Sequence, residues 1–277
     1  MKAPLNQVVT PNSFQELFSA WNRFPEAVLY AGGTNLISKQ DKNILYLPPV
    51  FLSLDKIEEL QKITRTEQYL EIGSMVKLNR VIRLGKIVPE VLTLCLEKIA
   101  GTQLRNIATI GGNICATSRW LDLHAPLTAL DAQYEFRNAS NATRWVSASR
   151  FHSPEHAMLE KHELLTRIRL PLHQWDYTIY KKFYQEDYFI SNSLVFLART
   201  QKNILSDIRV IYKGNAIFRN KDGEDILKGK YLPLNRKTSH DFIESWHKYL
   251  AEKPEIDEFS KYSLLNCIEK NVFDLSE

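Results

Sequence analysis

The sequence predicts an α+β fold with two domains, on the basis of three observations. Strand-like and helix-like segments follow one another in mixed order up to residue 173, without the regular alternation of a doubly wound parallel sheet. From residue 174 onward, three strand candidates come first and a helical tail follows. The chain has 277 residues, 44% of them hydrophobic and 25% charged, which is enough to bury a core in each domain. We therefore place a domain boundary near residue 173.

The first helix is predicted to begin at Ser13, because Ser13 and Glu16 form a capping box ahead of apolar residues at helical spacing. Pro25 lies just beyond this pattern. An apolar run at residues 27–31 then predicts a buried strand that ends in the tight loop Gly32-Gly33-Thr34-Asn35. Further strands are expected at residues 44–47, 51–54 and 69–73.

Helices are expected around residues 78–84 and at residues 91–100, with Gly101 as the stop signal of the second. A second glycine doublet, Gly111-Gly112, follows the apolar Ile110. The remaining expected elements are strands at 133–136 and 163–170, a polar turn at 138–141, strands at 178–183, 193–197 and 208–212, and helices at 242–250 and 262–271.

Composition excludes several classes of protein. No apolar run approaches the roughly 18–20 residues that span a bilayer, and the first residues, MKAPLNQVVTPNSF, lack the apolar core of a secretory signal. The three cysteines are scattered, which argues against a disulfide framework or an iron–sulfur cluster on this chain and favours the reducing cytoplasm. The net charge of +4 is spread along the chain, so nucleic acid is not an expected partner.

The two glycine doublets are the most distinctive local feature. Four of the ten glycines lie in Gly32-Gly33 and Gly111-Gly112, each after an apolar run and each before a small hydrogen-bonding residue. Glycine accepts positive φ and has no Cβ, so backbone N–H groups can converge on an anion. Two such loops on opposite sides of a cleft could hold a diphosphate, although each doublet alone is also typical of an ordinary tight turn.

Other catalytic motifs are missing from the sequence. It contains no Walker loop, no G-x-G-x-x-G fingerprint and no H-E-x-x-H metal motif. His124 is better explained as a structural residue than as a catalytic base, and Ser118 lacks the G-x-S-x-G setting of a hydrolase nucleophile. An anion-binding cleft without an acid–base or nucleophile set indicates that the chemistry belongs to a bound cofactor.

Three segments carry a family resemblance: residues 31–36 (AGGTNL), 72–78 (IGSMVKL) and 99–114 (IAGTQLRNIATIGGNI). They resemble the FAD-binding medium subunits of molybdenum hydroxylases, the family of the FAD subunits or domains of xanthine dehydrogenase and carbon monoxide dehydrogenase. The third segment matches nearly residue for residue. Counterparts also exist for Ser118, Asp122, Pro126, residues 163–165, residues 169–171 and Lys181. The likeness runs from about residue 5 to the C-terminus and weakens after residue 200.

The resemblance implies a fold and a set of cofactor-binding residues. The fold would be the FAD-binding type of p-cresol methylhydroxylase, with two α+β subdomains at about residues 1–55 and 56–173. A C-terminal α+β domain, residues 174–277, would follow with a three-stranded sheet and helices. The implied FAD-binding positions are Leu29, Tyr30, Ala31, Gly32, Gly33, Thr34, Asn35, Leu36, Ile99, Thr109, Ile110, Gly111, Gly112, Asn113, Asp122, Leu165 and Lys181.

The resemblance also implies individual roles for these positions. Backbone amides of residues 29–36 and the Thr34 hydroxyl would donate to the FAD diphosphate, and residues 109–113 would form a second loop. Asp122 would accept hydrogen bonds from the cofactor, Leu165 would pack beside the nucleotide, and Lys181 would lie near the isoalloxazine edge. The alternatives are a simple capping role for Asp122 and a solvated Lys181 next to Lys182.

The implied function is that of an electron-transfer subunit in a heterotrimeric oxidoreductase of the xanthine dehydrogenase type. A molybdopterin-binding large subunit and a [2Fe–2S] small subunit would be partners, with NAD⁺ as the expected acceptor, and no catalytic or metal-binding residue is expected on this chain. Two other classes stay open: a stand-alone flavin oxidoreductase, and a structural subunit that has lost FAD.

Two segments depart from the family pattern. Arg119 and Trp120 replace small residues after Ser118, which would alter FAD or nicotinamide access or fill the cleft. Residues 185–190 replace a segment that is more arginine-rich in the family, so the identity of the electron acceptor is left open. The substrate (purine, aldehyde, heterocycle or carbon monoxide) would be selected by the large subunit.

Overall fold

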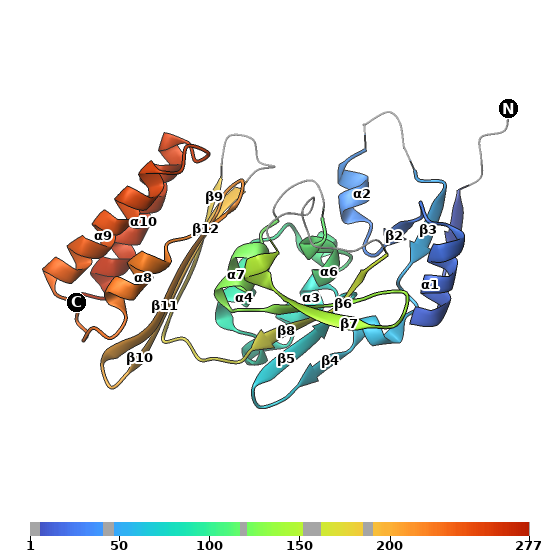
Figure 1. The fold of residues 1–277 in the computed structure, drawn as a ribbon, viewed down its shortest axis with the longest axis horizontal. Helices are drawn as coiled ribbons and strands as arrows, with labels where there is room; N and C mark the ends of the chain where they lie inside the picture. Colours follow the sequence, from blue (N-terminus) through green and yellow to red (C-terminus); the bar gives the residue numbers. More distant parts are fainter. Residues whose placement is uncertain (1–5, 41–46, 117–120, 152–161, 185–190, 277) are drawn as a thin grey trace. The chain divides into compact units, whose positions relative to one another are not determined.

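The computed structural model describes residues 6–40, 47–116, 121–151, 162–184 and 191–276 (Figure 1). Contacts between residues divide the chain into two compact units. The first unit consists of Met1–Val88, Ile99–Leu121 and Asp131–Leu172; the second consists of Pro89–Lys98, Asp122–Leu130 and His173–Glu277. The chain thus passes repeatedly between the units, and the domain limits 1–173 and 174–277 stay a prediction. Ser118, Arg119, Trp120, residues 185–190 and most of the predicted strand at 44–47 lie outside the described residues.

A small parallel sheet forms one part of the first unit. Its order is β1 (Gln7–Val9), β3 (Val50–Ser53) and β2 (Val28–Tyr30). Helix α1 (Phe14–Arg23) buries Leu17 and Phe18 against Leu52 and Leu54. The predicted cap is confirmed, because the Ser13 hydroxyl accepts a hydrogen bond from the Glu16 amide at 3.2 Å. The Glu16 carboxylate accepts from the Asn12 amide at 2.8 Å, one residue before the position that a capping box would use.

A five-stranded antiparallel sheet forms the other part of the first unit. Its order is β4 (Ile63–Arg65), β5 (Tyr69–Gly73), β8 (Leu164–Pro171), β6 (Gln133–Arg137) and β7 (Thr143–Ser147). One face is apolar and fully buried, as at Leu70, Ile72 and Ile168. The other face carries charge, and Arg167 lies 2.8 Å from the Glu71 carboxylate and 3.0 Å from that of Glu135. This alternation is typical of a sheet with one covered face.

Short helices connect the strands of the first unit. They are α2 (Thr34–Ser38), η1 (Glu58–Gln61), α3 (Leu78–Ile82), η2 (Gly85–Ile87), α5 (Thr102–Arg105), α6 (Ile110–Ile114) and η3 (Ala148–Arg150). The prediction that Gly101 stops the preceding helix is wrong, because that helix, α4 (Glu90–Glu97), ends three residues earlier than expected. Ala100 takes the left-handed conformation (φ 46°), and Gly101 is extended and precedes α5.

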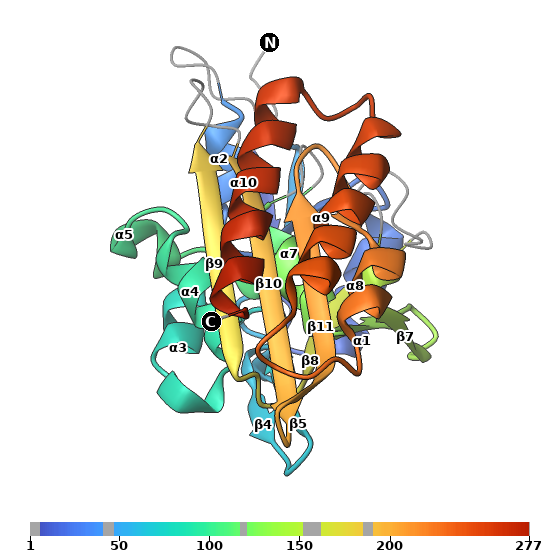
Figure 2. The same ribbon diagram turned by 90° about the vertical axis from the view of Figure 1, so that its left-hand side faces the viewer.

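The second unit is built on an antiparallel sheet with helices on both faces. The strands are, in order, β12 (Ile217–Arg219), β11 (Ile204–Lys213), β10 (Ser191–Gln201) and β9 (Tyr177–Tyr184). Helices α8 (Lys221–Leu227), α9 (Arg236–Ala251) and α10 (Glu258–Asp274) cover one face (Figure 2). Helices α4 and α7 (His124–Ala129) pack on strands β9 to β11.

Because both faces are covered, every side chain from Leu194 to Ala198 is fully buried. The three predicted strands of this sheet and the helical tail are confirmed. Among the described residues this sheet has four strands and not the expected three, since β12 is too short to show a strand pattern in the sequence. The α+β class is confirmed. Among the described residues, no helix has both the length and the apolar character needed to span a membrane.

Candidate functional site

A cavity of about 430 Å³ in the first unit brings the two glycine doublets together. Loops after β2 and β5, helices α2 and α6, and strand β8 contribute its walls. Thirteen of the predicted site residues line it: Leu29, Tyr30, Ala31, Gly32, Gly33, Thr34, Asn35, Leu36, Thr109, Gly111, Gly112, Asn113 and Leu165. A cavity of this size, mostly apolar with a few polar groups, is typical of a site for a small molecule or cofactor.

The first doublet presents free backbone donors. Gly33 adopts φ 71°, which favours glycine, and directly precedes α2. The amides of Gly32, Gly33 and Thr34 donate no hydrogen bond to any residue that the structure describes. Gly32 also packs so closely on the chain that a Cβ there would lie within 3.0 Å of the Ile107 carbonyl group. This loop can therefore offer several N–H groups to an anion.

The second doublet also lines the cavity, but its amides are hydrogen-bonded within the protein. The amides of Ile110 and Gly111 donate to the carbonyl oxygens of Val76 (3.0 Å) and Ser74 (2.9 Å). The Gly112 amide donates to the Thr109 hydroxyl at 3.0 Å, so Thr109 caps α6. A Cβ on Gly111 would lie 2.6 Å from the Ser74 Cβ. The doublet thus allows close packing of α6 on the chain after β5, and these three amides are already used within the protein.

Two side-chain atoms give this wall of the cavity its hydrogen-bonding capacity. The Ser74 hydroxyl and the Asn113 Oδ1 are buried, line the cavity and have no hydrogen-bond partner among the described residues. Buried polar groups without a partner are rare in folded proteins. A ligand with donor and acceptor groups would satisfy both atoms. The residues present therefore fit a nucleotide cofactor with an anionic diphosphate near Gly32 and Gly33.

Four predicted site residues lie elsewhere. Ile110 is fully buried, Ile99 does not line the cavity, and Asp122 and Lys181 belong to the second unit. Within that unit the Lys182 Nζ lies 2.9 Å from the Asp122 carboxylate. The two side chains are only 11% and 13% exposed. Neighbouring residues of a strand point to opposite faces of the sheet, so Lys181 does not share the face that Asp122 contacts.

His124 is held in its neutral form. It is buried, and this burial together with the nearby charge of Lys213 lowers the pKa of His124 to about 3. Its place in α7 of the second unit favours the structural interpretation over a catalytic base.

Sequence reasoning did not nominate several lining residues. They include Val28, Lys39, Leu54, Ser74, Met75, Ala108, Cys115, Ala116, Leu121, Glu163 and Leu164. Ser74 and Met75 lie in the IGSMVKL segment, which was a detectable signal. No sequence pattern pointed to Cys115 as a lining residue. Burial raises the pKa of its thiol to about 12, so the thiol is unreactive at neutral pH.

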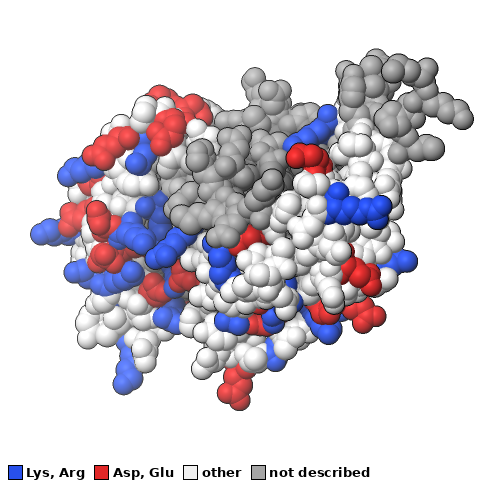
Figure 3. Space-filling view, turned by 45° about the vertical axis from the view of Figure 1, so that its right-hand side comes forward, with Lys and Arg blue, Asp and Glu red and all other residues white. Residues whose placement is uncertain are grey.

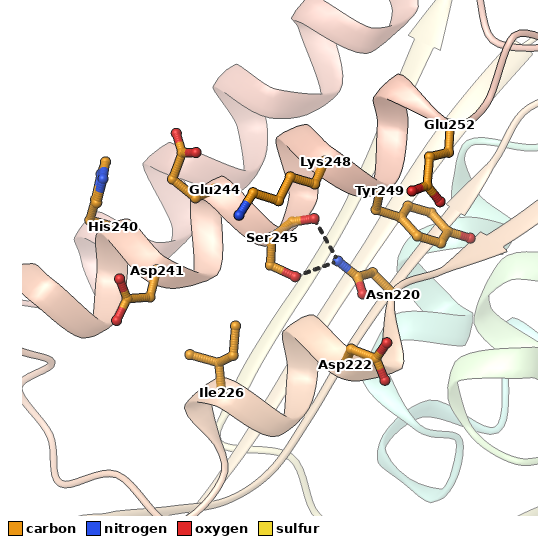
Figure 4. A pocket seen from close by; sticks show the side chains of 10 residues that line it. All are labelled: Asn220, Asp222, Ile226, His240, Asp241, Glu244, Ser245, Lys248, Tyr249 and Glu252. Carbon is orange, nitrogen blue, oxygen red and sulfur yellow. Dashed lines mark hydrogen bonds between the residues drawn. The ribbon is translucent and has the colours of Figure 1, made fainter.

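A second cavity, of about 520 Å³, lies between α8 and α9 of the second unit (Figure 4). Asn220 donates to the backbone and hydroxyl oxygens of Ser245 at 3.2 and 3.0 Å. Acidic side chains surround this pair, among them Asp222, Asp241 and Glu244. No predicted site residue lies here, and no cluster among the described residues is arranged to hold a metal ion. We therefore assign the candidate site to the first cavity.

The fold and the cavity define an α+β protein with a site for a nucleotide-sized ligand. Residues 4–173 match the family described as the FAD binding domain in molybdopterin dehydrogenase. The chain therefore belongs to this family of FAD-binding domains.

Individual relatives agree with this assignment. The chain is 31% identical over 245 residues to Xanthine dehydrogenase 2 of Arabidopsis thaliana, covering 79% of this chain and 18% of that protein. It is 34% identical over 152 residues to the xanthine dehydrogenase FAD-binding subunit of Escherichia coli O157:H7, covering 53% and 51%. The chain therefore spans about a fifth of the plant enzyme and half of the bacterial subunit.

A solved structure shares the fold over the whole chain. Quinoline 2-oxidoreductase from Pseudomonas putida 86 superposes with a TM-score of 0.80 at 20% identity, covering 100% of this chain and 98% of that one.

Proposed function

We propose that this chain binds FAD and serves as the electron-transfer subunit of a molybdenum hydroxylase. The observation that carries the proposal is one cavity lined both by Gly32 and Gly33, whose amides donate to no described residue, and by Ser74 and Asn113, each with a buried polar atom that has no described partner. Bound FAD would supply a two-electron carrier between an iron–sulfur donor and an acceptor, for which NAD⁺ is our expectation.

The chain's own residues would bind and orient the cofactor. The amides of residues 32–34 would donate to the diphosphate, where Lys39 adds a positive charge at the cavity. The Ser74 hydroxyl and Asn113 would fix the orientation of polar groups, while Leu165, buried on β8, would exclude water from the cofactor. For Asp122 and Lys181 a role in cofactor binding stays a prediction. Lys182 joins them as a candidate because it holds Asp122.

The proposed assembly contains partner chains. We propose a molybdopterin-binding large subunit and a [2Fe–2S] small subunit in a heterotrimeric enzyme of the cytoplasm, since the three cysteines of this chain are free and scattered. The relatives bear names that refer to xanthine and quinoline. Because similar chains occur in proteins named for two different compounds, we propose that the large subunit and not this chain selects the substrate.

The first experiment is the visible absorption spectrum of the purified chain, followed by release and identification of the cofactor. We expect flavin bands and released FAD rather than FMN. A colourless protein that takes up no added FAD would refute the proposal and leave the structural-subunit alternative. Turnover of a substrate by the isolated chain would instead support a stand-alone flavin oxidoreductase.

A further inference from the structure

Charge marks no docking surface on the face drawn in Figure 3, because positive and negative side chains are interspersed there over the described residues. Exposed aromatic side chains, by contrast, gather on helix α10 of the second unit. This helix packs beside α9 on one face of the sheet, and both helices face the viewer in Figure 2. Phe259, Tyr262 and Phe273 of α10 are 72%, 67% and 60% exposed. Large apolar groups gathered on one surface are typical of an interaction site.

Helix α10 is apolar on two opposite sides, and the core of the second unit covers only one of them. Leu264, Ile268 and Val272 are buried in this core. An α-helix has 3.6 residues per turn, so the three exposed aromatic residues lie on the side opposite to the core. A surface helix of a globular protein usually carries polar residues on that side. The fold of a single chain therefore does not account for the three exposed rings.

Asn266 and Lys270 are exposed too, and they complete a stripe along the outer side of α10. We call Phe259, Tyr262, Asn266, Lys270 and Phe273 the α10 stripe. Its members follow one another at steps of three, four, four and three residues. This order of steps is the same from either end, and its centre, Asn266, is also the midpoint of α10. A stripe with this symmetry can face a second copy of itself in antiparallel orientation, about a two-fold axis at Asn266.

Antiparallel pairing matches each member of the α10 stripe with a suitable group. Phe259 faces the partner's Phe273, and aromatic pairs attract each other beyond the burial of their area. Tyr262 faces the partner's Lys270, which gives a cation–π contact. Asn266 faces the partner's Asn266, and two amide side chains can exchange hydrogen bonds. Parallel pairing would instead oppose Lys270 with the partner's Lys270, which is unfavourable.

The α10 stripe is large enough for a weak specific dimer. A fully buried aromatic side chain removes about 150–250 Å² of surface from water. At the exposed fractions given above, the rings of two copies would together bury roughly 600–1,000 Å². Asn266 and Lys270 add to this area, which brings the total near the roughly 1,000 Å² that a specific interface needs. We therefore expect association at micromolar concentrations and not a permanent dimer.

We propose that α10 is a self-association surface, on which a second copy of this chain docks in antiparallel orientation with the two-fold axis at Asn266. A second copy is the occupant because the α10 stripe supplies both members of every contact. The inference concerns the second unit alone and does not depend on a bound cofactor.

The test is sedimentation velocity of the purified full chain at concentrations between about 1 and 200 µM. Two double variants examine the register, Phe259→Glu/Phe273→Glu and Phe259→Lys/Phe273→Glu. The matched control is Tyr231→Glu, which replaces an aromatic residue of the same unit that is 70% exposed and lies outside α10. Thermal unfolding of each variant shows whether it folds as the wild type does.

We expect the wild type and the control to form dimers as the concentration rises. The Phe259→Glu/Phe273→Glu variant should raise the Kd of the dimer at least about tenfold, because the pairing then opposes glutamates of the two copies. The Phe259→Lys/Phe273→Glu variant should dimerise about tenfold more tightly than that, because each introduced lysine then faces an introduced glutamate of the other copy. Parallel pairing would oppose like charges in both variants, so equal Kd values for the two would overturn the antiparallel register. A wild type that stays monomeric at every concentration would overturn the self-association surface itself.

Discussion

Replacing Gly32 with alanine tests the packing on which the candidate site depends. The new Cβ would lie 3.0 Å from the Ile107 carbonyl carbon, 3.1 Å from the Ala108 Cα and closer still to the carbonyl oxygen. All three are backbone atoms, so no side-chain rotation can relieve the contact. The two loops must separate by roughly 1 Å to restore an ordinary C···O distance of about 3.3–3.6 Å.

The cost of such overpacking is about 1–3 kcal/mol. If the loops separate and so relieve the overpacking, the cost appears as lost free energy of cofactor binding. The reason is that the amides of Gly32 and Gly33 then move away from their positions at the cavity. At about 1.4 kcal/mol for each factor of ten, the Kd for FAD should rise by roughly 5- to 150-fold. The assay is a titration of the FAD-free chain with FAD, followed by flavin fluorescence.

The matched control is Gly101→Ala in the same region of the chain. A Cβ there would meet only the end of the Gln103 side chain, at 3.2 Å, and Gly101 has a negative φ. We expect this variant to bind FAD as the wild type does. Thermal unfolding of both variants without FAD separates a binding defect from a folding defect. A Gly32→Ala chain with wild-type Kd and Tm would refute the close packing described here.

Three further predictions concern the second unit. The pKa of His124 is lowered in the folded protein, so the unfolded chain binds the proton more readily and stability falls as the pH drops below 6.5. Urea unfolding should show a loss of about 2–3 kcal/mol in the free energy of unfolding between pH 6.5 and 4.5. The variant His124→Gln should not show this loss. Trp246 is fully buried, and Trp246→Ala should cost about 3–5 kcal/mol in the same assay, with a smaller cost counting against the core assignment. Asp257 caps α10 by accepting from the Ser260 amide at 2.8 Å, and Asp257→Ala should cost about 0.5–2 kcal/mol at neutral pH. Hydrogen bonds from the Ser260 side chain and amide lower the pKa of Asp257, so the difference in stability from the wild type should shrink as the carboxylate is protonated in acid.

Features that depend on local chain physics were predictable from the sequence. The Ser13 cap and the strand Tyr69–Gly73 were placed correctly, because capping and strand patterns involve residues a few positions apart. The backbone conformation of the first doublet was also predictable from residue type, since Gly33 adopts the left-handed conformation that glycine favours, directly before a helix.

Features that depend on distant partners were not predictable. The amides of Ile110 and Gly111 donate to Val76 and Ser74, more than thirty residues earlier in the chain, so the sequence could not reveal that they are already used. The choice between Lys181 and Lys182 depends on which face of β9 meets Asp122, which two adjacent lysines do not disclose. Helix α4 ends at Glu97, and Ala100 then takes a left-handed conformation that alanine rarely adopts, which the sequence does not signal.

The repeated passage of the chain between the two units has a consequence for how the protein can be divided. Helices α4 and α7 reach the C-terminal sheet from segments that precede residue 131. A fragment beginning at residue 173 would keep the sheet and α8 to α10, but its other face would expose side chains such as Val195, Leu197 and Ile211 to water. We infer that a fragment cut at residue 173 is not an independent folding unit, because it would lose the apolar cover that α4 and α7 give to the sheet.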